Sequence, residues 1–98
     1  MVGAGGTGGY YGGALARAGN QVTMVARGPH LAAIRATGLQ VNTVLLGDFH
    51  LDVDATDDMS SVGPVDLVIF AVKSYGTNAA IRDMGPLVGD DTMIISTQ

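Results

Sequence analysis

The sequence predicts an α/β domain of the Rossmann type: a doubly wound, mostly parallel sheet with an inserted β-hairpin and a truncated first strand. Gly3, Gly5 and Gly8 have the G-x-G-x-x-G spacing that joins the first strand of a dinucleotide-binding βαβ unit to its helix. Strand-like and helix-like segments alternate after these glycines. The run 66–72 is apolar almost throughout, as expected for a parallel strand that is buried on both faces.

Composition fits one small domain, residues 1–98, because the chain is too short for two. Hydrophobic residues make up 47% and charged residues 14% of the chain, and the mean hydropathy is +0.32, which excludes a disordered chain. The absence of cysteine excludes disulfides, thiolate metal sites and cysteine nucleophiles. The apolar runs are far shorter than the roughly 20 residues needed to cross a bilayer. Without a visible signal peptide, we expect a soluble, cytoplasmic protein that makes no membrane contact.

The first strand and the first helix flank the glycines. Only two residues precede Gly3, whereas strands usually have about five or six residues, so we expect the first strand to be truncated. Residues 7–18 predict a helix that Gly19 ends. Gly12 and Gly13 lie inside this helix and each costs about 1 kcal/mol of helix propensity relative to alanine. A close contact between the helix and the sheet would explain that cost.

A second strand and a second helix follow. Residues 21–26 are rich in β-formers and place Arg27 at the carboxyl end of a strand. Gly28 and Pro29 open the next helix, which Gly38 ends. Segments 39–44 and 48–53 alternate around a Leu-Gly turn and predict the hairpin, as an insertion or at a sheet edge.

The second half of the sequence contains a loop, a buried strand, a helix and a last strand. The polar segment 55–64 predicts a loop with room for one helical turn, in which Asp57 and Asp58 act as loop or capping groups and not as metal ligands. The buried strand 66–72 ends at Lys73. Residues 77–84 predict a short helix that Gly-Pro breaks, and 92–96 predict the last strand.

The distribution of charge favours a phosphorylated dinucleotide. Residues 1–47 contain three arginines and no acid, whereas all nine aspartates lie in residues 48–98. Proteins that bind NAD usually carry Asp or Glu about 20 residues after the glycine loop, to hold the ribose 2′-hydroxyl. Arg27 occupies that place, and its guanidinium matches the oxygens of a 2′-phosphate. The alternative for Arg27 is a solvated surface side chain, and the alternative for the glycines is a turn without a ligand.

Lys73 and the candidate proton donors do not form a complete catalytic set. An ammonium at the end of the buried strand could reach a cofactor ribose, a phosphate or a substrate carboxylate, or it could extend into solvent. Reduction of a carbonyl needs a proton donor besides the hydride, and the candidates are Lys73, Tyr75, His30 and His50. His50 falls in the hairpin, where we expect it to be exposed. We therefore assign no catalytic residue within the 98 residues.

Several stretches together match a known family. They are 2–10 (VGAGGTGGY), 15–19 (LARAG), 25–31 (VARGPHL), 34–39 (IRATGL), 55–58 (ATDD) and 65–73 (VDLVIFAVK). On these stretches the whole chain resembles the N-terminal domain of the ketopantoate reductase (2-dehydropantoate 2-reductase) family. The glycine loop alone is generic, but its combination with the Arg-Gly step and the Val-Lys strand end is more specific.

The resemblance implies that the full enzyme reduces 2-dehydropantoate to pantoate with NADPH, on the route to pantothenate and coenzyme A. Its implied cofactor-binding residues are Gly3, Ala4, Gly5, Gly6, Thr7, Gly8, Arg27, Ala71, Val72, Lys73 and Gln98. The glycine loop would hold the pyrophosphate and Arg27 the 2′-phosphate. In the family, a helical C-terminal domain supplies the catalytic and substrate-binding groups. We therefore expect this chain to be an NADP-binding fragment that is inactive alone and has exposed apolar surface.

Two other functions stay open. The chain could be a stand-alone nucleotide-binding module without catalysis, or part of a reductase of another 2-keto acid. The partner of the full enzyme is then a small 2-keto acid, and a homodimer is also open. Three arginines and a pI near 4.6 argue against a nucleic-acid surface.

Overall fold

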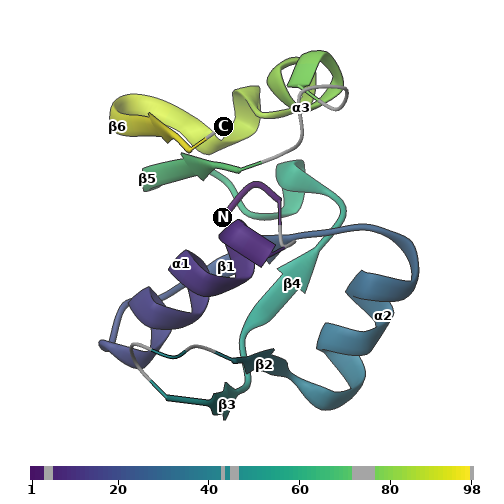
Figure 1. The fold of residues 1–98 in the computed structure, drawn as a ribbon. Coiled ribbons are helices and arrows are strands. Elements are labelled where there is room, and N and C mark those ends of the chain that lie inside the picture. Colours follow the sequence, from purple (N-terminus) through teal and green to yellow (C-terminus); the bar gives the residue numbers. More distant parts are fainter. Residues whose placement is uncertain (4–5, 43, 45–46, 72–76, 98) are drawn as a thin grey trace.

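The computed structural model describes residues 1–3, 6–42, 44, 47–71 and 77–97, and it alternates strands with helices (Figure 1). The helices are α1 (Gly6–Arg17), α2 (Gly28–Thr37) and α3 (Thr77–Asp83), with short 3₁₀ turns η1 (Met59–Ser61) and η3 (Gly85–Leu87). The strands are β1 (Thr23–Val25), β2 (Leu39–Val41), β3 (Phe49–Leu51), β4 (Asp54–Thr56), β5 (Val65–Phe70) and β6 (Val88–Ser96). This arrangement confirms the predicted α/β class.

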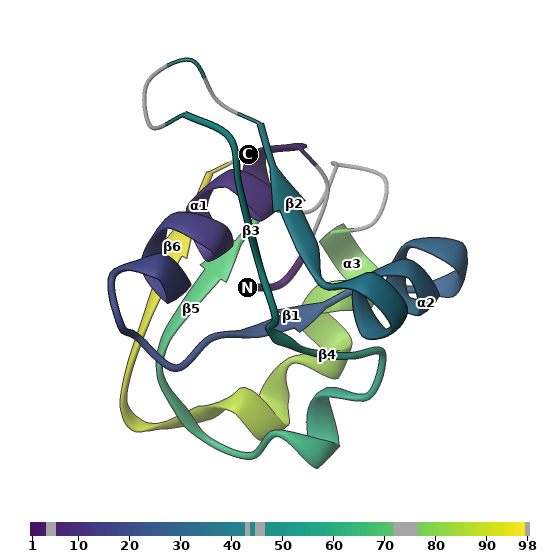
Figure 2. The ribbon, with the colours of Figure 1, turned by 90° about the horizontal axis from the view of Figure 1, so that it is seen from below.

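A parallel sheet organises the molecule. β1 pairs with β4, and β5 pairs with β6, both in parallel. Val2 joins the two pairs, because it bridges Val25 on one side and Phe70 on the other, again in parallel. The order is therefore β4, β1, Val2, β5, β6, with the chain start at the centre (Figure 2). In this order the sheet is wound outwards in both directions from the first strand, as in a Rossmann fold.

Glycines bring α1 against the sheet and the hairpin. A Cβ at Gly12 would lie 2.6 Å from Met24 Sδ, and a Cβ at Gly13 would lie 2.5 Å from Val41 Cγ2. Real Cβ contacts are longer than this, so only glycine allows the helix to pack so closely. The predicted explanation for the helix-weakening glycines is confirmed.

The hairpin lies beside α1 and α2. β2 and β3 are antiparallel, with Gln40 opposite His50. Gly38 ends α2 with φ 82° and ψ −170°, and its N–H donates to Ile34 O at 2.8 Å. Because this conformation is essentially restricted to glycine, the chain can turn directly from the helix into β2. The predicted hairpin and the predicted stop of the helix are both confirmed.

Two apolar clusters cover the two faces of the sheet. One cluster joins Met24 of β1 to Leu31 and Ile34 of α2 and to the hairpin residues Leu39 and Val41. The other joins Val2 and β5 to α3, η1 and η3, through the residues Val68, Phe70, Met59, Ala80, Met84 and Leu87. Burial on both faces explains why residues 68–70 are continuously apolar.

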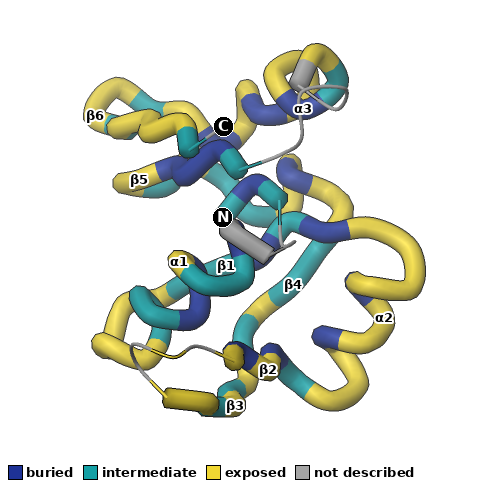
Figure 3. The backbone as a smooth tube through the Cα atoms, viewed as in Figure 1, coloured by how far each residue is buried: buried dark blue, intermediate teal, exposed yellow. Residues whose placement is uncertain are grey.

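The β6 end of the sheet is exposed. Met93 is 63% exposed, and Ile94 and Ile95 are exposed as well (Figure 3). These neighbours point to opposite faces of the strand, so neither face of β6 is covered by the described residues. β6 therefore presents apolar surface on the outer strand of the sheet.

Two strands differ from their predictions. Residues 54–56 were expected within a loop or the end of the hairpin, but they form β4, the outer strand beside β1. β6 begins at Val88, earlier than the predicted residue 92. Both differences have the same cause. A short polar segment can become a strand by pairing with a strand that is distant in the sequence, and local composition does not predict such pairing.

Candidate nucleotide-binding edge

Backbone hydrogen bonds align the carboxyl ends of the parallel strands at one edge of the sheet. Gly3 N donates to Val25 O at 3.1 Å, and Ala71 N donates to Val2 O at 2.8 Å. Next to them, Ala26 N donates to Thr56 O at 3.0 Å. Ligands of open α/β sheets bind at this edge, where the strand order reverses. Here the reversal lies at Val2, between β1 and β5.

The start of α1 faces this edge. Gly3 has φ 100°, which favours glycine, and a Cβ at Gly8 would overlap the carbonyl oxygen of Gly3. No acidic residue stands in the first turn of α1. The free N–H groups and the helix dipole therefore favour an anion there. Ala4 and Gly5 lie outside the described residues, and of Gly6 and Thr7 only the helical backbone is described.

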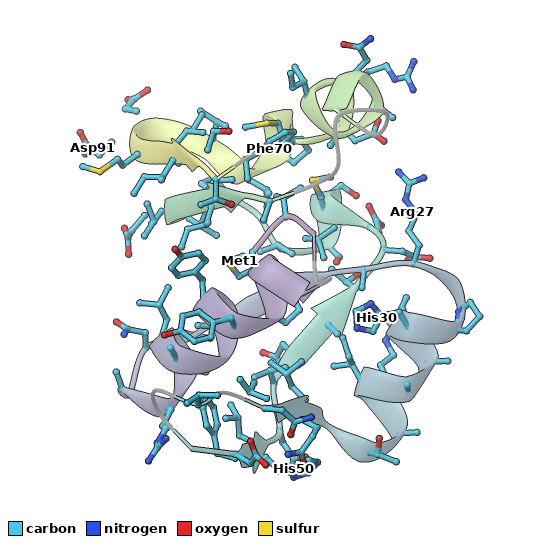
Figure 4. The ribbon with its side chains drawn as sticks, viewed as in Figure 1. Met1, Arg27, His30, His50, Phe70 and Asp91 are labelled. Carbon is cyan, nitrogen blue, oxygen red and sulfur yellow. The ribbon has the colours of Figure 1, made fainter. Side chains whose placement is uncertain are left out.

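Arg27 follows β1 at the same edge and precedes the first turn of α2. Its backbone is extended, with φ −136° and ψ 158°, and its side chain makes no capping hydrogen bond. The side chain is exposed and extends away from the body of the molecule (Figure 4). Within the described part of the chain, no carboxylate forms an ion pair with Arg27. The guanidinium is therefore available to an external anion.

The remaining predicted cofactor-binding residues follow β5 and β6 in the sequence. Ala71 directly follows β5, is half-buried and donates its N–H to Val2 O. Val72, Lys73 and Gln98 lie outside the described residues, as does the candidate proton donor Tyr75. Sequence reasoning did not single out Thr97, whose N–H donates to Phe70 O at 3.0 Å. Its hydroxyl is buried and has no hydrogen-bond partner among the described residues. The sequence feature that could have identified Thr97 is its position directly after the last predicted strand.

The two histidines lie on different elements. His30 is exposed in the first turn of α2. His50 is exposed on β3, as expected, and its Nε2 contacts the carbonyl oxygen of Thr37 at the end of α2 (Figure 4). This contact connects the hairpin to the helix, so His50 has a structural partner.

Asp58 also has a structural role. Asp58 caps η1, because its Oδ1 accepts from Ser60 N at 3.0 Å, which confirms the predicted capping role. The described residues contain no group of three or more histidine or acidic side chains that could hold a metal ion.

A cavity of about 780 Å³ lies at the opposite, amino edge of the sheet. Its lining includes Met1 and the first residues of β1 and β5, Thr23 and Val65. The position of the cavity and the topology of the strands therefore indicate different edges of the sheet as the ligand site. The carboxyl edge combines the glycine turn, the start of α1 and Arg27, whereas the residues that line the cavity include no N-terminus of an α-helix.

Comparison with known proteins identifies the family. The sequence profile of the family described as "Ketopantoate reductase PanE/ApbA" matches residues 1–98. The chain belongs to the ketopantoate reductase family. It is 38% identical over 88 residues to the 2-dehydropantoate 2-reductase of Pyrococcus abyssi, an alignment that covers 90% of this chain and 28% of that protein. This confirms the resemblance found in the sequence.

Solved ketopantoate reductases have the same fold. The PanE/ApbA family ketopantoate reductase from Ralstonia eutropha JMP134 superposes with a TM-score of 0.84 at 43% identity, over 96% of this chain and 33% of that one. A ternary structure of D-mandelate dehydrogenase with NADH and anilino(oxo)acetate superposes with a TM-score of 0.83 at 26% identity, over 98% and 33% of the respective chains. The chain therefore spans about a third of the length of these relatives. None of its described helices is long and apolar enough to cross a membrane.

Proposed function

We propose that these 98 residues are the NADPH-binding part of an enzyme that reduces 2-dehydropantoate to pantoate. Membership of an oxidoreductase family and similarity to 2-dehydropantoate 2-reductases support the reaction. The observation that carries the cofactor is Arg27: an exposed guanidinium, without a carboxylate partner among the described residues, at the carboxyl end of β1. The catalytic and substrate-binding groups are assigned to a further, helical domain, so these residues alone are inactive.

Each part of the nucleotide has a proposed partner on the chain. The pyrophosphate lies at the start of α1, where Gly3, Ala4, Gly5, Gly6, Thr7 and Gly8 let the backbone N–H groups approach it. Arg27 binds the 2′-phosphate through charge-assisted hydrogen bonds. Ala71, Val72, Lys73 and Gln98, at the ends of the next strands, contact the remainder of the cofactor. The cofactor supplies the hydride, and the chain binds and orients it.

A reductase of another 2-keto acid is the second candidate. The D-mandelate dehydrogenase structure, which contains NADH and anilino(oxo)acetate, supports it, because its fold matches over 98% of this chain. A stand-alone nucleotide-binding module is the third. Under the first two proposals the protein acts in the cytoplasm on a small 2-keto acid, and a homodimer is compatible with the exposed apolar surface of β6.

Calorimetric titration with NADPH and, separately, NADH tests the cofactor assignment. We expect the chain to bind NADPH more tightly than NADH. Arg27→Ala removes charged hydrogen bonds worth about 1.5–3 kcal/mol, so NADPH affinity should fall roughly 10- to 100-fold while NADH affinity stays unchanged. Arg82→Ala is the matched control, since Arg82 is exposed on α3 and its contact with Asp83 is a weak surface pair of 3.9 Å.

Two results would contradict the assignment. Equal affinity for the two cofactors would remove the NADP preference, and an unchanged preference in Arg27→Ala would remove Arg27 from the site. If the chain is folded by circular dichroism and binds neither cofactor, the stand-alone module is excluded.

A further inference from the structure

Thr97 has a buried hydroxyl that makes no bond within the described part of the chain. Its Oγ1 is shielded from solvent and has no hydrogen-bond partner among the described residues. Burying an unpaired hydroxyl costs free energy, because its hydrogen bonds to water in the unfolded chain are not replaced. Thr92 of β6 differs: its Oγ1 accepts from Gly89 N at 2.8 Å and donates to Val65 O at 2.5 Å. The Thr97 hydroxyl is therefore a candidate for a bond to a ligand.

Thr97 lies in a row of residues at the carboxyl edge of the sheet. Ala71 N donates to Val2 O at 2.8 Å, and Thr97 N donates to Phe70 O at 3.0 Å. By the parallel register of these strands, Gly3, Ala71 and Thr97 lie side by side. Adjacent strands are about 4.8 Å apart, so Thr97 is about 10 Å from the glycine turn.

The side chain of Thr97 is on the face of the sheet against which α1 packs. Phe70 points to the opposite face, in the cluster that contains residues of α3. Phe70 is paired with Ser96, so Ser96 shares that face and Thr97, one residue later, points to the other. The Met1 side chain is also on this second face, since it packs at Gly12 of α1. Thr97 therefore shares both an edge and a face of the sheet with the start of α1.

The proposed orientation of the dinucleotide determines which part of it reaches Thr97. Arg27 follows β1, on one side of Val2, and is the proposed partner of the 2′-phosphate on the adenosine half. With the pyrophosphate at the glycine turn, the other half extends in the opposite direction, over the ends of β5 and β6. This half carries a ribose and a carboxamide, whose polar groups can each bond to a hydroxyl.

We propose that Thr97 Oγ1 is a hydrogen-bond partner of the nicotinamide half of the cofactor, at its ribose or its carboxamide. This inference rests on the proposed function. Thr97 as a whole is half-buried, and a turn about χ1 from one staggered position to another brings the hydroxyl from the interior towards the ligand. Cofactor binding then satisfies a group that has no partner in the free chain.

Thr97→Val and Thr92→Val are a matched pair, because the same isosteric change is made at opposite edges of the sheet. Thr97→Val removes an unpaired hydroxyl, so without cofactor it should melt at least about 4 °C higher than the unsubstituted chain. Its NADPH affinity should fall about two- to tenfold, the loss expected for one neutral hydrogen bond. Thr92→Val loses two hydrogen bonds, so it should melt lower, with NADPH affinity unchanged.

Adenosine 2′,5′-bisphosphate separates this inference from the proposed function, because it carries the 2′-phosphate but no nicotinamide half. Thr97→Val should bind it as tightly as the unsubstituted chain does, whereas Arg27→Ala should bind it more weakly. Thr97→Ser retains the hydroxyl and should bind NADPH within about twofold of the unsubstituted chain.

An unchanged NADPH affinity in Thr97→Val would overturn the inference and leave the proposed function standing. Equal losses of affinity for NADPH and for the bisphosphate would also overturn it, because the effect would not belong to the nicotinamide half. A lower melting temperature of Thr97→Val would show that the hydroxyl has a partner within the chain, with the same consequence. If the unsubstituted chain bound neither NADPH nor the bisphosphate, the proposed function would fail together with the inference.

Discussion

Arg27 owes its position to its immediate neighbours in the sequence. β1 ends at Val25, Ala26 N donates to Thr56 O, and Gly28, with φ 56°, begins α2 directly before Pro29. Each of these features is local, so sequence reasoning could place the arginine. It could not show that the side chain is exposed without a carboxylate partner among the described residues, which depends on the tertiary arrangement.

Alanine at Gly8 and alanine at Gly12 of α1 should destabilise the fold by different amounts. Gly8→Ala would force a Cβ into the Gly3 carbonyl oxygen, a backbone atom that cannot move without disrupting the glycine turn. Gly12→Ala would meet the flexible ends of Met24 and Met1. We expect both to lower the free energy of unfolding, Gly12→Ala by about 1–3 kcal/mol and Gly8→Ala by more. Urea denaturation measures the order, and a smaller loss for Gly8→Ala would contradict the packing described here.

The amino group of Met1 predicts a pH dependence of stability. Burial lowers its pKa below the ordinary value near 8, because desolvation penalises the charged form. The unfolded chain therefore retains the proton at pH values where the folded chain has lost it. Stability should be fully present above about pH 8 and should fall as the pH decreases towards the pKa of the folded state.

An N-acetylated chain is the control for this pH dependence. It has no titrating amino group, so its free energy of unfolding should not show this fall between pH 8 and the lower pKa that the amino group has in the folded chain. Denaturant melts of both chains across this pH range, with mass spectrometry to verify that Met1 is retained, make the comparison. Identical slopes for the two chains would contradict the burial of the amino group.

At the scale of elements, the connection from α2 into the hairpin depends on Gly38. An alanine there would combine a strained backbone at φ 82° and ψ −170° with a Cβ only 2.8 Å from Leu51 O. We expect Gly38→Ala to cost about 3 kcal/mol or more. Gly63→Ala is the matched control: Gly63 has a similar φ of 78° but no atom within 4 Å of the added Cβ, so only the backbone cost of about 1–2 kcal/mol applies.

Thermal and urea melts of the two variants separate the cost of backbone strain from the cost of steric overlap of the added Cβ. Equal losses of stability would show that the hairpin does not pack on Gly38.

Elements with a strong local pattern were predicted, and those that depend on long-range pairing were not. The glycine turn gave α1, the Gly-Pro step gave α2, and alternation around a turn gave β2 and β3. β4 has three residues, two of them polar, and exists because Thr23–Val25 pairs with it. The first part of β6 contains Gly89 and two aspartates, and Thr92 Oγ1 accepts from Gly89 N at 2.8 Å and bonds to Val65 O.

At the scale of the whole molecule, the two edges of the sheet have different properties. The carboxyl edge has the glycine turn, the start of α1 and Arg27, and is the predicted nucleotide site. The amino edge has the cavity between β1 and β5, which polar residues such as Gln21 and Asp54 line together with apolar ones such as Leu15 and Leu87. The sequence predicted the first edge, because strand ends and glycines can be located along the chain. It did not predict the second, which is formed by residues distant in sequence.

The most direct test of a nucleotide site at the carboxyl edge is an amide chemical-shift map of the chain titrated with NADPH. We predict that the largest changes occur at the carboxyl edge, at Gly3, Gly8, Arg27, Gly28 and Ala71. Arg27 should shift less with NADH, which lacks the 2′-phosphate. Changes concentrated instead at the amino edge, around Thr23, Asp66 and Leu67, would contradict the placement of the nucleotide at the carboxyl ends of the strands.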